Sequence, residues 1–308
     1  MYISSVANAR KHTRKIQCLE SFAQGVRATG NSVLVEWEHR YTPSRLAVVL
    51  GWATTNTGGR NIVLRKQIIA DQRRLGNHTM CIDASCWKYL DDHGSYLRYS
   101  LNGPFYDRAE YANHNSTDAK WQEISRNLAV TLQGHQHNIN GHVLICMQRD
   151  GGFAMKTLSP MNWLQDKINQ IRTVTQRAIH IRPHPGKYDM QDFNAYTGKH
   201  ATRQNIKLID PGQSRLLDNL QNAHSAVFFN SSASVAAACA GIPVFVDDSS
   251  CVSWAVANHD VSKIESHTEF ERQQWIWDLA SAHWSDADAQ QGRIYQKFLP
   301  YLTSTVTS

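Results

Sequence analysis

The sequence lacks several patterns that would place it in common protein classes. No run of about 18 or more apolar residues occurs in its 308 residues, which excludes a transmembrane helix. The amino terminus has no continuous apolar stretch followed by a small-residue cleavage site, so a secretory signal peptide is not expected. No GxGxxG motif follows an apolar run, which argues against a dinucleotide-binding oxidoreductase.

Cysteine is present but in no paired arrangement. None of the six cysteines forms a CxxC pair, and most lie inside apolar runs, where a free thiol packs as a small hydrophobic side chain. A zinc site needs such ligands at short spacing, so no metal site is expected. These features predict a cytoplasmic protein with reduced thiols (in the host cytoplasm if the chain is viral) and no membrane partner.

The positive charge of the chain is concentrated near its amino terminus. The formal net charge is +6, but residues 1–75 hold twelve Lys and Arg against four Asp and Glu, a charge of +8, which leaves −2 for the remainder. Such asymmetry predicts that an anionic macromolecule binds the amino-terminal part. Solubility and surface ion pairs explain the same charge equally well.

The first half alternates short helices and strands. Hydrophobic spacing and stop signals predict helices over 11–27, 61–75 and 120–133, and strands over 32–37, 46–50 and 78–83. Residues 94–115 are aromatic and rich in turn signals. The polar, glycine-flanked stretch 133–141 predicts the crossing between two domains, 1–138 and 139–308.

The second half has a more regular pattern. Apolar runs predict strands over 142–147, 178–182, 206–209, 225–229 and 243–246, with helices over 161–172, 214–223 and 233–240 between them. Residues 272–302 are expected to be largely helical and to fold back across the molecule. This alternation predicts a doubly wound α/β domain, whose ligands bind beyond the carboxyl ends of the strands.

Three loops at such strand ends carry groups suited to a phosphate. Asn230–Ser232 precedes a helix, where hydroxyls and backbone N–H groups can bind an anion, although most helices use a capping serine anyway. In the loop 182–187 two prolines hold His184 between Arg182 and Lys187, so that it can donate to a phosphate or protonate a departing nucleotide. A structural histidine is the alternative. In the loop 148–152 adjacent glycines allow close approach of a ligand to the backbone.

The order of these motifs carries a resemblance. Arg-Pro-His-Pro, followed about 45 residues later by Asn-Ser-Ser, a helix and Gly-Ile-Pro-Val, resembles the HP and SS motifs of GT-B glycosyltransferases, including bacterial sialyltransferases and the Kdo transferases of capsule assembly. The wider frame is similar to a glycosyltransferase family common in phage and prophage genomes. The matching stretches are 95–103, 181–186, 229–232, 240–245, 254–260 and 275–284.

The resemblance implies an α/β, GT-B-like fold of two Rossmann-like domains facing a cleft, with a carboxyl-terminal helical segment. It also implies that 1–138 binds the acceptor and that 139–308 binds a nucleotide-sugar, the co-substrate of a metal-independent transferase without a further cofactor. The residues expected at the donor are Arg149, Gly151, Arg182, His184, Lys187, Asn230, Ser231 and Ser232. Among them, His184 is expected to take part in catalysis.

The general base of such enzymes usually lies in the amino-terminal domain, in an acidic motif often followed by glycine. Asp83 ends a predicted strand at the corresponding place, but Ala84 and Ser85 follow it and the glycine is missing. The rival is the acidic pair Asp91 and Asp92, which Gly94 follows closely and which also fits an ordinary turn.

The acceptor expected from the sequence is a hydroxymethylated pyrimidine in phage DNA. The basic charge and a group of aromatic residues that can stack on an extruded base favour it. That group is Tyr89, Tyr96, Tyr99, Phe105 and Tyr106, and the expected acceptor or DNA contacts are Arg10, Lys11, Arg14, Lys15, Arg98 and Asn102. Two alternatives stay open: a glycosyltransferase acting on a surface polysaccharide or capsule, and a non-catalytic nucleic-acid-binding protein.

Overall fold

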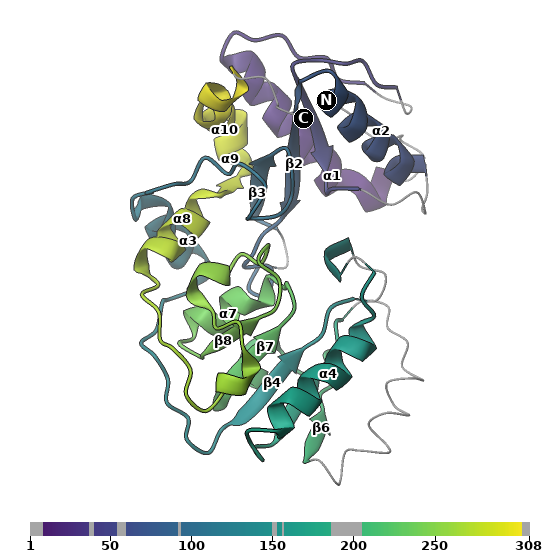
Figure 1. Ribbon diagram of the computed structural model, residues 1–308. Helices are drawn as coiled ribbons and strands as arrows, with labels where there is room; N and C mark the ends of the chain where they lie inside the picture. The colour runs from purple at the N-terminus through teal and green to yellow at the C-terminus, as the bar shows by residue number, and fades with distance from the viewer. Residues whose placement is uncertain are drawn as a thin grey trace. The chain divides into compact units, whose positions relative to one another are not determined.

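The computed structural model describes residues 9–36, 40–53, 60–91, 94–149, 153–155, 157–185 and 205–303, with the side chains of 9–13 and 15 left out. The chain divides into two compact units (Figure 1). Unit 1 comprises residues 1–116 and 278–308, and unit 2 comprises residues 117–277. This division differs from the boundary expected at residues 138 and 139, because the polar stretch 133–141 lies inside unit 2 and the carboxyl-terminal segment belongs to unit 1.

Unit 1 is built on a mixed four-stranded sheet. Its elements are α1 (Ala9–Ala28), β1 (Leu46–Leu50), α2 (Arg60–Arg74), β2 (His78–Ala84), β3 (Tyr96–Leu101), β9 (His283–Ser285), α9 (Asp286–Gln290), α10 (Arg293–Phe298) and the 3₁₀ turn η5 (Leu299–Leu302). The strand order is β1-β2-β3-β9. β1 and β2 are parallel, whereas β3 is antiparallel to both β2 and β9.

Side chains alternate along the strands of this sheet, so apolar residues point to both of its faces. Helices cover each face and bury these residues. Ala47 and Val49 of β1 pack with Ile68 of α2 on one face. On the other face Val48 joins a core that also contains α1, α10 and residues of β2 and β3. The polypeptide that returns from unit 2 therefore completes the core of unit 1.

Unit 2 contains a fully parallel five-stranded sheet. Its elements are α3 (Ala119–Leu128), β4 (His142–Cys146), η2 (Phe153–Met155), α4 (Pro160–Arg172), β5 (Ile179–Arg182), β6 (Ile206–Leu208), α6 (Leu216–Leu220), β7 (Ala223–Phe228), α7 (Ala233–Cys239), β8 (Val244–Val246), η3 (Trp254–Val256) and η4 (Val261–Lys263). The chain returns to unit 1 within α8 (Gln273–Ser281). The strand order is β6-β5-β4-β7-β8, and every neighbouring pair is parallel.

This strand order reverses between β4 and β7. After β4 the chain adds β5 and β6 on one side, then returns to add β7 and β8 on the other. Right-handed crossovers in opposite directions place helices on opposite faces, and Figure 1 shows α4 and α7 flanking the strands. Ile168 of α4 packs on Val143 and Ile145. The point of reversal is where open α/β sheets bind their ligands.

The elements predicted from apolar runs are present, and most of the differences lie in unit 1. The expected strand over 32–37 is wrong in its described part, since residues 32–36 form no strand. Two strands were not predicted: β3 lies in the aromatic, turn-rich stretch, and β9 interrupts the helical segment near the carboxyl end. The helix expected over 120–133 ends at Leu128, because Ala129 adopts a left-handed backbone with φ of 51°.

Candidate functional site

The carboxyl ends of four strands in unit 2 bring the motif residues to one edge of the sheet. Neighbouring strands lie about 4.8 Å apart, so the loops after β5, β4, β7 and β8 are adjacent. In that order these loops carry His184, Arg149, Asn230–Ser232 and Asp247–Asp248. The structure therefore collects the described donor-binding candidates at the point of strand reversal. Gly151 and Lys187 lie outside the described residues.

A chain of hydrogen bonds ties three of these strand ends together. The buried Gln148 side chain donates from Nε2 to the Asn230 carbonyl at 2.6 Å. The Asn230 amide donates from Nδ2 to Ser250 Oγ and, at 3.4 Å, to Asp248 Oδ1. The amide of Asn230 is thus engaged inside the protein, so Asn230 positions the loop. Sequence reasoning passed over Gln148, although a polar residue directly after a buried strand is a usable signal.

The two serines of the motif differ in their surroundings. Ser231 Oγ accepts a hydrogen bond from the Ala233 backbone N–H at 3.2 Å, and its carbonyl accepts one from Ser234 Oγ at 2.6 Å. Ser232 is exposed and makes no capping hydrogen bond with its side chain. Ser231 therefore shapes the turn into α7, and the hydroxyl of Ser232 is accessible to a ligand.

The HP loop begins with a residue that holds the fold. Arg182 donates from Nη1 to Asn219 Oδ1 and, at 3.3 Å, to Ser214 Oγ, which fastens the end of β5 to α6. His184 follows two residues later and is half-buried, and Arg149 after β4 is exposed. Of the basic residues at this edge, Arg149 and His184 are better placed than Arg182 to meet a phosphate.

A nearly buried ion pair joins α4 to the same edge of the sheet. Lys167 of α4 lies 2.9 Å from Asp247 Oδ2, with side chains 12% and 16% exposed. Trp163 Nε1 donates to the same oxygen at 2.6 Å, and its ring meets Phe229 edge-on at 6.2 Å. Because Lys167 and Trp163 of α4 both bond to Asp247, and Trp163 also packs on Phe229, the ends of β7 and β8 are held against α4. These supporting residues were not predicted.

In unit 1 the candidate bases differ in accessibility. Asp83 ends β2 with 39% of its side chain exposed, and Arg98 Nη2 lies 3.1 Å from its Oδ2. Asp91 is buried and accepts hydrogen bonds from Ser95 Oγ at 3.1 Å and from the Tyr96 backbone N–H at 3.2 Å. Asp91 is therefore a structural turn residue. Asp92 lies outside the described residues, so Asp83 is the accessible carboxylate of the two described.

Three expected acceptor contacts serve unit 1 itself. Arg98 has a side chain only 12% exposed and is paired with Asp83. Asn102 adopts φ of 63° and accepts from the Thr79 N–H at 3.1 Å, at the end of β2 opposite to Asp83. Arg14 pairs with Asp286 and donates to the Gly94 carbonyl at 2.6 Å. The side chains of Arg10, Lys11 and Lys15 lie outside the description.

Two of the aromatic residues expected to stack on a base are buried in the core of unit 1. Tyr96 and Tyr99 are 2% and 0% exposed, so they belong to the core and cannot stack on a base. Tyr106 packs against Tyr111 at 5.2 Å and accepts a hydrogen bond from Asn113 Nδ2 at 3.0 Å. Burial raises the pKa of Tyr106 to about 12. The burial of these rings shows that most of this aromatic stretch builds unit 1.

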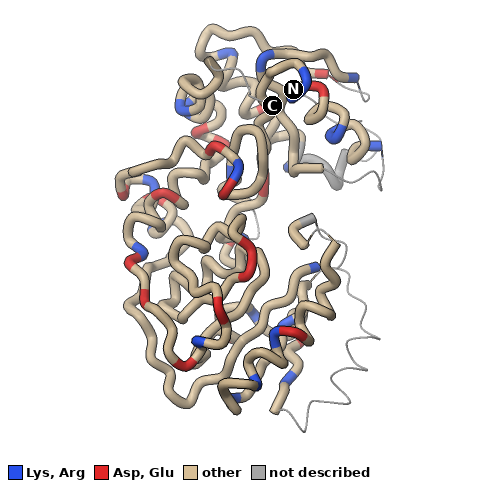
Figure 2. Tube along the Cα trace, in the orientation of Figure 1, with Lys and Arg blue, Asp and Glu red and all other residues tan. Residues whose placement is uncertain are grey.

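The basic residues of the first 75 positions are also partly used within the protein. Arg45 Nε donates to the Leu302 carbonyl at 3.0 Å, Arg65 bonds to the Gly51 carbonyl at 3.1 Å, and Arg74 pairs with Asp71 at 3.3 Å. Figure 2 shows the Lys and Arg positions of unit 1 spread over several elements rather than gathered on one. In the described part of the chain the basic residues are therefore divided among several elements, and some of them bond within unit 1.

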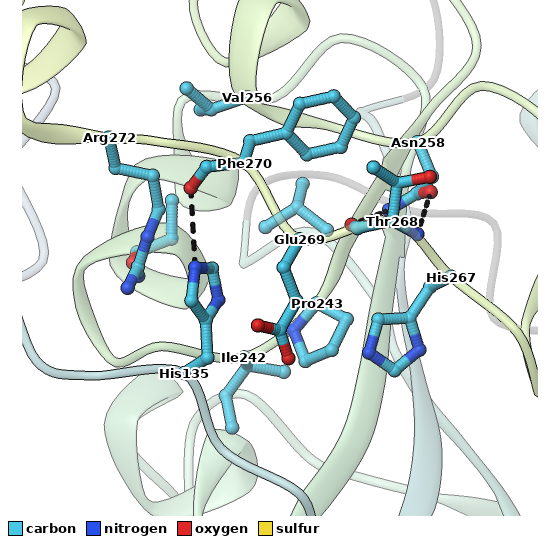
Figure 3. A pocket seen from close by; sticks show the side chains of 12 residues that line it. His135, Ile242, Pro243, Val256, Asn258, His267, Thr268, Glu269, Phe270 and Arg272 are labelled. Carbon is cyan, nitrogen blue, oxygen red and sulfur yellow. Dashed lines mark hydrogen bonds between the residues drawn. The ribbon is translucent and has the colours of Figure 1, made fainter.

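The cavity of Figure 3 lies at the amino end of β8 and is not suited to a nucleotide-sugar. Its volume of about 10 Å³ admits little more than one water molecule. Asn258 pairs through its side chain with the backbone of Thr268 at 2.8 and 3.1 Å, and Arg272 donates to the Gln133 carbonyl at 2.7 Å. Arg272 also donates to the Ala238 carbonyl, so this side chain joins Gln133 to the end of α7.

The cysteines, the possible metal ligands and the helix lengths complete the description of the chain. All six cysteines are buried thiols that form no disulfide, as their apolar surroundings predicted. Within the described ranges, no group of three or more His, Cys, Asp or Glu side chains is arranged to hold a metal ion. Over the same ranges, no helix has the length and apolar character needed to cross a membrane.

Comparisons with known proteins give similarity in structure. No protein family model and no curated protein matches the chain. The chain is similar to the β-Kdo 2,4 transferase of KpsC from Thermosulfurimonas dismutans, with a TM-score of 0.55 and 13% identity over 91% of this chain and 89% of that one. Two further solved structures are more distant.

The first is the β-Kdo 2,7 transferase of the same KpsC, with a TM-score of 0.47 and 12% identity over 96% of this chain and 99% of that one. The second is the Methanocaldococcus jannaschii UDP-GlcNAc 2-epimerase bound to UDP-GlcNAc and UDP, with a TM-score of 0.39 and 14% identity over 96% of this chain and 82% of that one. At such identities the likeness concerns the fold. Together with the parallel sheet of unit 2, it shows that the chain has an α/β fold of the GT-B-like type.

Proposed function

We propose that this protein is a glycosyltransferase that moves a sugar from a nucleotide-sugar to a hydroxyl group of an acceptor. The observation that carries the proposal is the set of loops at the strand reversal of unit 2, which carry Arg149, His184 and Ser232. Cationic, imidazole and hydroxyl groups at the carboxyl edge of a parallel sheet suit a diphosphate or phosphate ester. The fold shared with a Kdo transferase supports the same class of reaction.

In the proposed reaction the acceptor oxygen attacks the anomeric carbon of the donor. Asp83 takes the acceptor proton, and the bond from the anomeric carbon to the phosphate oxygen breaks with its electron pair leaving on the nucleotide. His184 and Arg149 offset the charge that develops on the departing phosphate, and Ser232 donates a hydrogen bond to it. In this proposal the donor-binding groups belong to unit 2 and the candidate base Asp83 belongs to unit 1. With the phosphate charge offset by these groups, the proposed reaction uses no metal ion.

We favour a saccharide hydroxyl as the acceptor, as on a surface polysaccharide. The solved structure of similar fold is a Kdo transferase, and Arg14, Arg98 and Asn102 are engaged within unit 1. A hydroxymethylated pyrimidine in DNA is the second candidate, and the +8 charge of residues 1–75 favours it. Binding to DNA would weaken with salt, at a log–log slope of about −0.9 per phosphate contacted.

A donor screen followed by an acceptor assay tests the proposal. Nucleotide-sugars based on UDP, GDP, CMP and dTDP are screened by thermal shift, and a specific donor should add about 2.7 kcal/mol of stability at a hundredfold excess over its Kd. Mass spectrometry then follows transfer to oligosaccharides and to hydroxymethyl-pyrimidine DNA. Failure of every donor to bind or react would refute the proposal, and transfer to DNA alone would replace the favoured acceptor.

Substitutions locate the donor on unit 2. His184→Ala, or Ser231→Ala with Ser232→Ala, should weaken donor binding by about 1.5 to 3 kcal/mol, the usual cost of a lost charge-assisted hydrogen bond. Ser266→Ala is the matched control. Ser266 is an exposed serine outside the loops of this edge, and its backbone N–H donates to the Lys263 carbonyl. Wild-type donor affinity in the His184 and serine variants would remove those residues from the site.

A further inference from the structure

A nearly buried arginine lies directly beside the proposed base. Arg98 of β3 faces Asp83 of β2 in the antiparallel register, and on its other side it pairs with His283 of β9. Its side chain is 12% exposed. A guanidinium group has five N–H donors and stays charged, so burying it without partners would be costly.

The contacts of Arg98 distinguish Asp83 from its other neighbours. Nη2 lies 3.1 Å from Asp83 Oδ2, Nη1 lies 3.6 Å from Cys86 Sγ, and the guanidinium carbon lies 5.8 Å from the centre of the Tyr111 ring. Burial raises the pKa of the Cys86 thiol and raises that of Tyr111 to about 12, so both are neutral at neutral pH. Asp83 is therefore the negatively charged partner among these three contacts.

The carboxylate of Asp83 is held at both oxygens and still accessible. Oδ2 meets Arg98, and Oδ1 accepts the backbone N–H of Ala84 at 2.8 Å. Each carboxylate oxygen has a second lone pair, and 39% of the side chain is exposed. An acceptor hydroxyl can thus reach a carboxylate whose orientation is already fixed, which lowers the cost of ordering it during the reaction.

We propose that Arg98 is a positioning residue, which holds the Asp83 carboxylate in the orientation that receives the proton of the acceptor hydroxyl. This inference rests on the proposed function, because it assumes that Asp83 is the base. Arg98 acts through Asp83 and touches neither substrate. The proton passes from the acceptor oxygen to Asp83, and that oxygen forms the new bond to the anomeric carbon as the bond to the nucleotide phosphate breaks.

The test compares Arg98→Met and Arg98→Lys with the wild-type enzyme, using the donor found by the screen. Arg98→Met should lower kcat on the order of 100-fold, as loss of orientation commonly does, while the donor Kd stays within about twofold. The KM for the donor should stay near the wild-type value, so that the loss is confined to kcat. Arg98→Lys, which keeps a cationic donor beside Asp83, should restore part of kcat.

Controls separate positioning from structural support. Arg45→Met removes an exposed arginine of unit 1, whose Nε bonds to the Leu302 carbonyl at the opposite end of the sheet, and should leave kcat unchanged. If Arg98→Met fails to fold, Arg98→Lys decides, with a lowered kcat and an unchanged donor Kd expected. A fall in kcat no larger than that of Arg45→Met in the deciding variant would overturn the inference.

Failure of the inference is distinguishable from failure of the proposed function. If the wild-type enzyme transfers no sugar, the proposed function fails. If it transfers sugar and Asp83→Asn is inactive while Arg98→Met keeps the wild-type kcat, only the role of Arg98 fails. Activity of Asp83→Asn at the wild-type level would remove the base and overturn the inference with it.

Discussion

At the scale of single residues, burial separates two carboxylates that look alike in sequence. Asp83 and Asp91 both follow strand or turn signals, but Asp91 is 5% exposed and accepts hydrogen bonds from Ser95 and Tyr96, whereas Asp83 is 39% exposed. A base must reach a proton on the substrate, so accessibility is the first requirement. The acidic-glycine motif around Asp91 is explained by the turn it builds.

These differences predict opposite effects for two matched substitutions. Asp83→Asn should abolish transfer and leave donor affinity near the wild-type value. Asp91→Asn should keep transfer but lower stability by about 1 to 3 kcal/mol, because the new amide cannot accept both buried hydrogen bonds as a carboxylate does. Urea unfolding and single-turnover assays of both variants check this, and a stable, inactive Asp91→Asn enzyme would reverse the assignment.

A pair of histidines at the amino end of the unit 2 sheet should make stability depend on pH. His142 and His180 stack with ring centres 3.8 Å apart. Burial, together with the positive charge that His142 and Lys207 contribute, lowers the pKa of His180 to about 4 from an ordinary value of 6.5. The folded state therefore disfavours protonation of His180. The free energy of unfolding is highest above pH 6.5, and it falls as the pH drops toward 4, because the unfolded chain binds the proton first.

The corresponding measurement compares urea midpoints at pH 7 and pH 4.5. His180→Gln should lose less stability over this interval than the wild-type protein, because the group whose protonation opposes folding is gone. His114→Gln, at a histidine with 75% of its side chain exposed, should keep the wild-type pH dependence. Equal pH dependence in His180→Gln and the wild type would show that the stacked pair does not contribute.

At the scale of elements, close packing of α1 on α9 joins the two ends of the chain in unit 1. Gly25 lies where the helices approach so closely that an added Cβ would be 1.8 Å from the Ala289 carbonyl oxygen and 2.8 Å from Gly292 N. Both atoms belong to the backbone, so no side-chain rotation can relieve the overlap. The absence of a side chain at Gly25 therefore permits the carboxyl-terminal segment to complete the core.

Gly25→Ala should force these helices apart and destabilise unit 1 by about 1 to 3 kcal/mol or more. Donor binding, which we assign to unit 2, should be unchanged at temperatures where unit 1 stays folded. Gly134→Ala serves as the control, because a Cβ at Gly134 would meet no atom within 4 Å. Calorimetry reports the loss, and a wild-type unfolding temperature in Gly25→Ala would contradict the observed packing.

At the scale of the whole molecule, the two units differ in how the chain builds them. Unit 2 is one continuous segment, 117–277, whereas unit 1 needs both 1–116 and 278–308. Within unit 1 the two linking segments lie side by side, since Asn113 Nδ2 donates to the Asp278 carbonyl and the Ser116 N–H to Asp278 Oδ1, each at 2.7 Å. Unit 2 is thus inserted into unit 1.

An inserted, continuous unit with its own core is expected to fold alone. A polypeptide of residues 117–277 should bind the donor with a Kd within about threefold of the full chain and gain about 2.7 kcal/mol at a hundredfold excess. It should transfer no sugar, because Asp83 is in unit 1. His184→Ala in the same polypeptide should weaken the donor-induced shift, and a tenfold weaker Kd in the unsubstituted polypeptide would show that unit 1 contributes to donor binding.

The sequence by itself determined the elements of unit 2 and the edge where its motifs meet. A continuous apolar run such as 142–147 is typical of a buried parallel strand. The position of the strand then determines where the loop that follows it lies. The boundaries of α4, β4 and β5 agree with their predicted ranges to within one residue. Local pattern was sufficient there because strand and loop are neighbours in the chain.

Only the tertiary structure decided which polar groups remain available for a ligand and where the chain's end belongs. Arg98, Asn102 and Asn230 look like binding residues in sequence, yet each is engaged by a partner that another element brings to it. β9 likewise joins β3 across about 185 residues of chain. Pairings of this kind depend on long-range packing, and burial then decides whether a charged or polar side chain serves the fold or the site.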